Sequence, residues 1–293
     1  MIKLVLSDMD GTLVPFGRDA ISRRTADAIR MLHMAGIDFG PATGREPVDL
    51  RRFFRGEERL FSTGIMANGK LVSYRGRLLR TIYLDHEGLQ RLAGLACERD
   101  DCTLNIYVPC KDERGRASAH VQFVGVSDAE LASARGVTGL ALMGEATDRL
   151  PSVPLISAGF MCLGSTRQDA VSQAREMRPQ LYRLCPQFDF LRPSPPFFDV
   201  LPKGWNKAAA LGILEESLGI ARDEIAFFGD SENDVAMLEA VPNSFAMENA
   251  TPAAKAAARF HIGDAGEDAV AQVMEAIASH GGELVIPPSI SRD

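Results

Sequence analysis

The stretch LVLSDMDGTLV, residues 4–14, places two aspartates one residue apart at the end of an apolar run. Residues 2–6 favour a short strand, whereas aspartate is a poor strand residue and two carboxylates so close repel each other. With the period-two geometry of a strand, Asp8 and Asp10 project to the same side where the strand gives way to its loop. Such a pair suits a hard cation such as Mg²⁺, or a nucleophile beside an acid–base group. An aspartate-rich turn bonded to its own backbone is the alternative for this stretch alone.

Length and charge set broad limits. The 293 residues suffice for one or two domains, and a net charge of −7 without a basic block argues mildly against nucleic acid as the main partner. No apolar stretch reaches the roughly 20 residues that cross a bilayer, and the first apolar run is too short for a signal peptide. We therefore expect a cytoplasmic protein with no membrane and no nucleic-acid partner, as a monomer or a small homo-oligomer.

Strand-like and helix-like segments alternate in two separate parts of the chain. In the first part, strands are expected at 2–6 and 37–40, helices at 20–35 and 47–54, and a strand with a hairpin at 64–84. Alternation resumes at residue 206, where NKAAALGILEESLG opens a helix that EIAFFGD follows as a buried strand. This order predicts an α/β fold with a Rossmann-like parallel-sheet core and helices on both faces.

Between these parts the pattern changes. Residues 103–109, 118–126 and 156–164 read as strands, residues 168–177 as a helix, and LYRLC (181–185) with FDFLRP (188–193) as a strand pair. The proline-rich RPSPP (192–196) marks the expected exit. We expect one domain of residues 1–84 and 191–293, interrupted by an inserted α+β domain of residues 85–190.

Three further stretches follow predicted strands of the parallel sheet or precede its helices: ATGR (42–45), LPKGWNK (201–207) and FFGDSEND (227–234). Ligands of such sheets bind beyond the carboxyl ends of the strands. Asp230 and Asp234 taken alone read as helix caps, but a second acidic pair at the same sheet edge requires a cation. Thr43 and Gly44 offer a hydroxyl and backbone N–H groups that suit an anion.

A lysine stands at an unfavourable place in the second of these stretches, LPKGWNK. Asn206 reads as an N-cap, which puts Lys207 in the first turn of a helix, where the dipole disfavours a cation. A local rule broken at a strand–helix junction indicates a site. Lys203 competes for the role, and Lys207 is the better candidate. Together with Mg²⁺, such a lysine would offset the charge of a phosphate approaching a carboxylate, so the parts predict phosphoryl transfer.

In this order and spacing, DMDGT, ATGR, the lysine of GWNKAAAL and GDSEND resemble the haloacid dehalogenase (HAD) superfamily of phosphatases, most closely its Cof-type members with a large inserted cap. The resemblance implies a HAD-like catalytic core and a cap at 85–190 that sets substrate specificity. Asp8 would be the nucleophile that forms an aspartyl-phosphate. Asp10 would protonate the leaving oxygen and then activate water.

The resemblance also assigns the remaining site residues. Mg²⁺ would be held by Asp8, the backbone carbonyl of Asp10, and Asp230, with Asp234 beside them. The substrate phosphate would be held by Thr43, Gly44, Lys207 and Asn233, and Asn68 would border the pocket. The expected reaction is hydrolysis of a small-molecule phosphate ester, by analogy a sugar phosphate. A phosphomutase of the same fold and a non-catalytic metabolite-binding protein are the alternatives.

Overall fold

The computed structural model of the chain describes residues 1–138, 144–191, 196–285 and 291–292. It divides into two units, Met1–Thr81 with Asn206–Asp293, and Ile82–Trp205. The second unit extends beyond the predicted 85–190 at both ends. At the C-terminal end it does so because β11 (Phe197–Pro202) pairs with two strands of its sheet. Residues 192–195, in the proline-rich stretch expected as the exit, lie outside the described residues.

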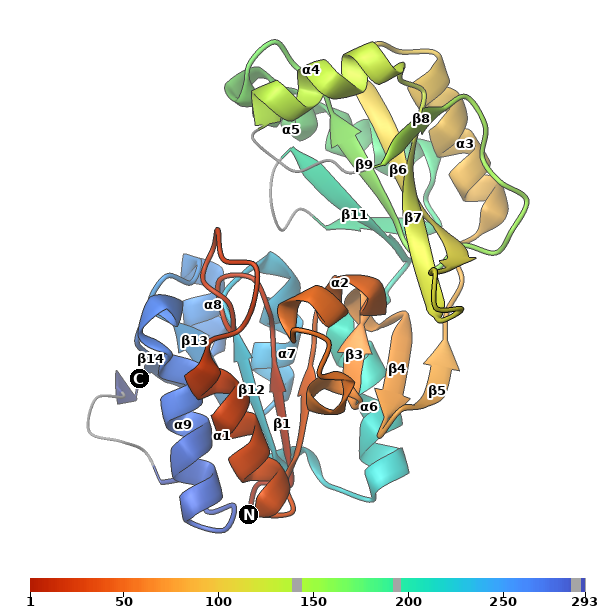
Figure 1. Cartoon of the computed structure of the whole chain (residues 1–293). Coiled ribbons are helices and arrows are strands. Elements are labelled where there is room, and N and C mark those ends of the chain that lie inside the picture. Colours follow the sequence, from red (N-terminus) through yellow and green to blue (C-terminus); the bar gives the residue numbers. More distant parts are fainter. Residues whose placement is uncertain (139–143, 192–195, 286–290, 293) are drawn as a thin grey trace. The chain divides into compact units, whose positions relative to one another are not determined.

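The first unit is built on a six-stranded sheet of order β15-β14-β13-β12-β1-β2 (Figure 1). Its five parallel strands are β1 (Leu4–Ser7), β2 (Asp38–Pro41), β12 (Ile225–Gly229), β13 (Asn243–Met247) and β14 (Phe260–Ile262). The sixth, β15 (Ser291–Arg292), is antiparallel to β14. All residues of β1 and β12 are buried, as expected of strands covered on both faces. The predicted parallel core is confirmed.

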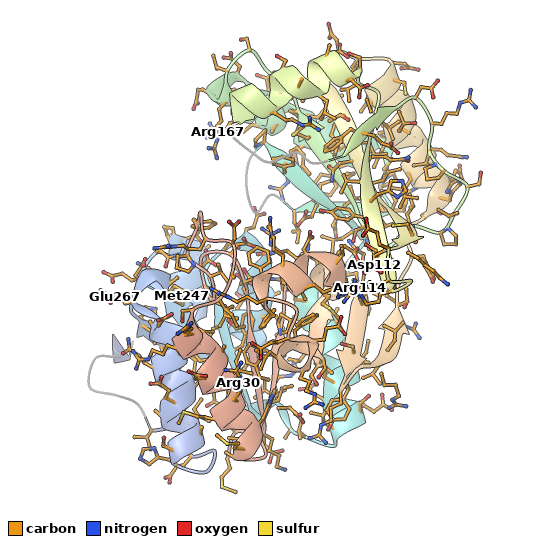
Figure 2. The ribbon with its side chains drawn as sticks, viewed as in Figure 1. Arg30, Asp112, Arg114, Arg167, Met247 and Glu267 are labelled. Carbon is orange, nitrogen blue, oxygen red and sulfur yellow. The ribbon has the colours of Figure 1, made fainter. Side chains whose placement is uncertain are left out.

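Helices cover both faces of this sheet. On one face α1 (Arg23–Met34) and α9 (Ala269–Ser279) pack side by side, and on the other α7 (Val235–Ala240) packs against β12 and β13 (Figure 1). The outer side of α1 carries Arg30, which pairs with Asp27 at 2.6 Å and with Glu57 at 2.5 Å (Figure 2). The other helices of this unit are α2 (Pro47–Phe53), α6 (Lys207–Leu218), α8 (Pro252–Ala257) and the short 3₁₀ turns Glu58–Phe61, Ala67–Gly69, Arg222–Glu224, Glu232–Asp234 and Ala265–Glu267.

The strand and hairpin expected at 64–84 form a small sheet of their own. It consists of the antiparallel strands β3 (Gly64–Met66), β4 (Leu71–Tyr74) and β5 (Arg77–Thr81). Between β3 and β4 the chain reverses through Ala67 and Asn68, which both have positive φ. A single parallel bridge, Ala42 to Ile65, connects this hairpin sheet to the loop after β2.

The second unit has a mixed six-stranded sheet of order β10-β11-β9-β6-β7-β8, which confirms the α+β class. Its remaining elements are α3 (His86–Cys97), β6 (Cys102–Lys111), β7 (Ala117–Val124), α4 (Asp128–Thr138), β8 (Glu145–Thr147), β9 (Ala158–Cys162), α5 (Arg167–Leu184) and β10 (Phe188–Leu191). The strand expected at 181–185 is wrong: α5 continues through Pro179 to Leu184, because Leu181 is on its buried face. Within the described residues, no helix is long and apolar enough to cross a membrane.

Candidate active site

A buried ion-pair cluster lies where β1 ends and α6 begins. Asp8 directly follows β1, and Lys207 is the first residue of α6. The Lys207 Nζ donates to Asp8 Oδ1 at 2.8 Å and to Asp234 Oδ1 at 2.7 Å, and all three side chains are buried. Asn206 is the N-cap, as predicted, and accepts a hydrogen bond from the backbone N–H of Ala209. A cation at this helix start is therefore stabilised by two carboxylates.

Lys203, the competing lysine, lies in a different setting. Its side chain is exposed, and its Nζ donates to Asp189 Oδ1 at 3.0 Å within the second unit. Burial alone would lower the pKa of Lys207, but the Asp234 and Asp8 carboxylates outweigh it and raise that pKa. The two carboxylates therefore favour the charged form of Lys207 beside Asp8.

Three carboxylates gather around this lysine. Asp8, Asp230 and Asp234 each offer a ligand atom, and these atoms all lie within 4.8 Å of one another. Burial raises the pKa of Asp8 well above its usual range, and repulsion by Asp234 adds to the rise, although Lys207 opposes it. Burial and then Asp234 likewise raise the pKa of Asp230 to about 7. The cluster thus has more negative charge than its single lysine offsets.

The free oxygens of this cluster suit a magnesium ion. Asp234 is fully engaged, since Lys207 binds Oδ1 and the backbone N–H groups of Asp230 and Ser231 bind Oδ2, each at 3.0 Å. Oδ2 of Asp8 and Oδ2 of Asp230 accept no hydrogen bond from any residue that the structure describes. Two buried carboxylate oxygens are the hard donors that Mg²⁺ prefers. The donor set therefore fits this cation, with Asp234 holding the lysine and the loop.

Asp10 is bound by an arginine that the sequence analysis left without a role. Arg45 Nε donates to Asp10 Oδ2 at 2.6 Å and Nη2 donates to Oδ1 at 2.7 Å, while its guanidinium lies 4.5 Å from the centre of the Phe53 ring. Both members of this pair are partly exposed. The pair joins the loop after β1 to the loop after β2. Neither DMD nor ATGR alone shows this pairing, because it depends on β1 and β2 lying side by side.

The loop after Asp10 depends on Gly11. Gly11 has φ +81°, and a Cβ atom there would lie 2.7 Å from Asp230 Oδ2 and 2.7 Å from the Phe16 ring. Beside it, Thr12 Oγ1 donates to Asp230 Oδ1 at 2.7 Å, and Asn249 Nδ2 donates to the Gly11 carbonyl at 2.8 Å. Thr12, which the sequence analysis did not single out, therefore orients Asp230.

Three of the predicted phosphate-binding residues, Thr43, Gly44 and Asn233, lie next to Asn68. The backbone N–H of Asn68 donates to the Thr43 carbonyl at 2.9 Å, and its side-chain Oδ1 accepts from Asn233 Nδ2 at 3.2 Å. A Cβ atom at Gly44 would lie 3.0 Å from Asn68 Nδ2. Thr43 Oγ1 accepts a hydrogen bond from the Arg45 backbone N–H at 3.2 Å. The positive φ of Asn68 thus places one amide between the loops after β2 and β12.

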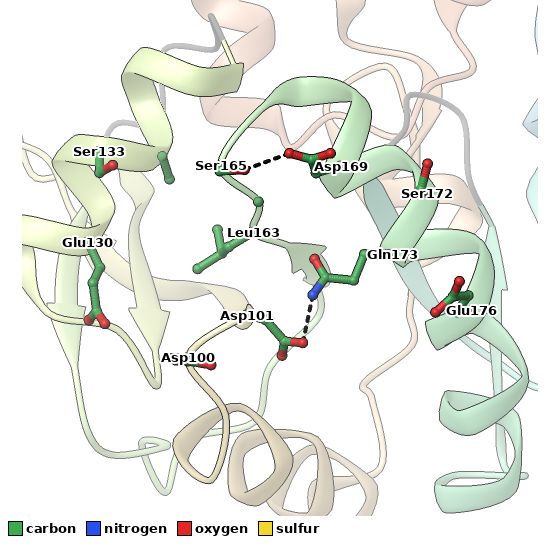
Figure 3. A pocket seen from close by; sticks show the side chains of 12 residues that line it. Asp100, Asp101, Glu130, Ser133, Leu163, Ser165, Asp169, Ser172, Gln173 and Glu176 are labelled. Carbon is green, nitrogen blue, oxygen red and sulfur yellow. Dashed lines mark hydrogen bonds between the residues drawn. The ribbon is translucent and has the colours of Figure 1, made fainter.

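The second unit contains a pocket of different character. It has a volume of about 610 Å³ and lies among α4, α5 and the segment before β6 (Figure 3). Its acidic side chains are Asp100, Asp101, Glu130, Asp169 and Glu176. Arg99 pairs with Asp101, and Gln173 Nε2 donates to the same carboxylate at 2.6 Å. This acidic lining disfavours a phosphate ester there.

A family model described as haloacid dehalogenase-like hydrolase matches residues 5–114 and 160–274. This chain belongs to the haloacid dehalogenase-like hydrolases. The predicted resemblance is thereby confirmed, and the matched ranges include every predicted site residue of this hydrolase.

Known relatives agree with this assignment. The hydrolase is 32% identical over 263 residues to an HMP-PP phosphatase of Klebsiella pneumoniae (strain 342), a match that covers 87% of this chain and 88% of the relative. A HAD/COF-like hydrolase from Plasmodium vivax has the same fold, with a TM-score of 0.75 at 19% identity over 95% of this chain and 96% of the other. The HAD subclass IIB sugar phosphatase BT4131 gives a TM-score of 0.71 at 20% identity over 96% and 100% of the two chains.

Proposed function

We propose that this hydrolase is a Mg²⁺-dependent phosphatase that releases phosphate from a small phosphorylated metabolite through an aspartyl-phosphate on Asp8. The observation that carries the proposal is the buried Lys207 held between Asp8 and Asp234, beside two carboxylate oxygens that accept no hydrogen bond within the described part of the chain. The curated relative from Klebsiella pneumoniae, a phosphatase by name, supports the same class of reaction.

Two steps account for the chemistry. Asp8 forms a bond to phosphorus while the bond from phosphorus to the ester oxygen breaks, and Asp10 gives its proton to that oxygen. Asp10 then takes a proton from water, whose oxygen displaces Asp8 and releases inorganic phosphate. Because Arg45 binds both oxygens of Asp10, proton transfer requires this ion pair to open.

The other residues position and neutralise the phosphate. Lys207 places a positive charge next to Asp8, and we assign Thr43, Gly44 and Asn233 to the phosphate oxygens. Asp8, the Asp10 carbonyl and Asp230 would hold Mg²⁺, with Asp234 beside them, and the bound cation would offset the charge of the incoming phosphate. We assign a part in substrate selection to the second unit, Ile82–Trp205.

Phosphate release from a substrate panel tests the proposal. The panel contains sugar phosphates, nucleotides, pyridoxal phosphate and HMP-PP, each with Mg²⁺, with chelator, and with chelator followed by excess Mg²⁺. We expect release with at least one ester, a loss on chelation of about 100-fold or more, and recovery on adding Mg²⁺. Isomerised sugar phosphate without released phosphate would identify a mutase instead. Metabolite binding without turnover of any ester would contradict the proposal.

The proton affinity of Asp230 makes the effect of Mg²⁺ depend on pH. Because the pKa of Asp230 is raised to about 7, its proton stabilises the metal-free folded protein. This stabilisation is complete below the ordinary pKa of 3.8 and is lost as the pH rises through 7. A cation must displace that proton. The rise in Tm on adding Mg²⁺ should therefore be small at about pH 5.5 and large at about pH 8.

Thermal unfolding with Mg²⁺ and with chelator at both pH values measures this effect. The matched control is Asp223→Asn, which removes an exposed carboxylate of the same unit and should leave the pH dependence unchanged. A Mg²⁺-induced shift of equal size at both pH values would show that Asp230 does not compete between proton and metal.

A further inference from the structure

An exposed aromatic ring lies on the loop that follows Asp10. Phe16 is 74% exposed, whereas Leu13 and Val14 just before it are buried, and it is the most exposed aromatic side chain among the described residues. Burying a phenylalanine side chain typically contributes about 1.5–3 kcal/mol. The exposed ring of Phe16 does not gain this stabilisation, so packing does not explain the phenylalanine at this position.

The loop that carries Phe16 is held in place by backbone hydrogen bonds. Gly11 N–H donates to the Val14 carbonyl at 2.8 Å, and Val14 N–H donates to the Met9 carbonyl at 2.8 Å. Beyond them, Arg18 N–H donates to the Pro15 carbonyl at 3.1 Å, which closes a turn around Phe16. Pro15 fixes its own φ, and Gly17 supplies φ +82°. The turn therefore presents the ring to solvent.

The ring is also close to the carboxylate cluster. Asp230 Oδ2 and the Phe16 Cε2 atom each lie 2.7 Å from the position that a Gly11 Cβ would occupy. The two atoms are therefore no farther apart than twice that distance. Asp230 Oδ2 is one of the two oxygens left free for a cation. A phosphate ester bound at this cluster would have its organic group within reach of the ring.

We propose that Phe16 is a specificity residue that stacks on the leaving group of the substrate, and that this leaving group carries a planar unsaturated ring. The inference rests on the proposed phosphatase function and deepens it. A phenyl face offers contact to a flat ring and has no hydrogen-bonding group. A leaving group rich in hydroxyls would lose water at this face without gaining partners, so a ring-bearing ester is favoured over an open-chain polyol phosphate.

Substrate discrimination by Phe16→Ala tests the inference. We compare kcat/KM for two ring-bearing esters, phenyl phosphate and pyridoxal phosphate, with that for glycerol 3-phosphate, which has no ring. Phe16→Ala should lower kcat/KM for the ring-bearing esters by about 5- to 100-fold, mainly through KM, because alanine substitution at base–aromatic stacks has losses of this range. The value for glycerol phosphate should change less than about twofold.

Three controls separate this role from others. Phe16→Tyr keeps the ring face and should retain kcat/KM for the ring-bearing esters within about threefold. Met34→Ala removes another side chain of similar exposure, at the end of α1, and should leave all substrates unaffected. The Mg²⁺-induced rise in Tm of Phe16→Ala should match wild type, which shows that Asp230 is undisturbed.

Two results would overturn the inference while the proposed function stands. In the first, the wild type releases phosphate from the panel, but Phe16→Ala lowers kcat/KM equally for glycerol phosphate and for the ring-bearing esters. This would show that the ring serves only the structure of the loop. The other is unchanged kcat/KM for the ring-bearing esters in Phe16→Ala. If the wild type releases phosphate from no ester, the proposed function fails and the inference fails with it.

Discussion

Replacing Asp8 with asparagine is expected to abolish phosphate release and to stabilise the metal-free protein. Activity should fall by on the order of 10⁴-fold or more, because an amide cannot form the covalent intermediate. Stability should rise because burial and repulsion by Asp234 raise the pKa of Asp8, so its ionised form disfavours folding above pH 3.8. An amide oxygen can still accept the hydrogen bond that Lys207 donates.

Phosphate release with Mg²⁺ and thermal unfolding in chelator measure the two effects. The gain in Tm should be larger near pH 8 than near pH 4, since pH 4 is close to the ordinary pKa of 3.8 and protonating Asp8 in the folded protein costs little there. Asp19→Asn, an exposed change shortly after the same loop, is the control and should alter neither quantity. Release that survives Asp8→Asn would refute the nucleophile assignment.

Replacing Lys207 with methionine should impair both activity and folding. The change keeps the length of the side chain but leaves Asp8, Asp230 and Asp234 without the buried cation. Removing one partner of a buried ion pair typically costs about 3–5 kcal/mol of unfolding free energy. Turnover should fall by about 10²- to 10³-fold or more, the range for loss of a preorganised group that stabilises charge.

Denaturant unfolding and phosphate release measure these losses, and two further variants interpret them. Lys203→Met removes an exposed lysine paired with Asp189 and should change the unfolding free energy by less than about 0.5 kcal/mol. Lys207→Met combined with Asp8→Asn should recover part of the stability, because less negative charge is left unpaired. If Lys203→Met loses activity and Lys207→Met keeps it, the lysine assignment is reversed.

Much of the core could be predicted because its signals are local. Short apolar runs alternate with amphipathic helices, and polar residues follow the strands at the edge where Asp8, Lys207 and Asp234 meet. The inserted domain was predicted less well. The LYRLC run favoured a strand at 181–185, but burial of Leu181 against the sheet of that unit keeps α5 intact through Pro179 to Leu184.

The contacts that sequence reasoning missed depend on loops meeting in space. Arg45 and Asp10 are 35 positions apart, and Thr12 and Asp230 are 218 positions apart. No periodicity relates such pairs, since their approach follows from the register of β1 with β2 and with β12. The exposure of the Phe16 ring also could not be predicted from the local sequence. The apolar residues before it suggest burial, and only the closed turn shows that the ring faces solvent.

The split of the core between the two ends of the chain also affects synthesis on the ribosome. β1 has two neighbours in the sheet, and β12, the one that brings Asp230, begins only at Ile225. At about 5–20 residues per second, β1 waits on the order of 10–40 s with one edge unpaired. The unit Ile82–Trp205 is continuous in sequence and emerges complete during that wait. In the nascent chain, Asp8 can therefore pair with Lys207 only after the inserted unit has left the ribosome.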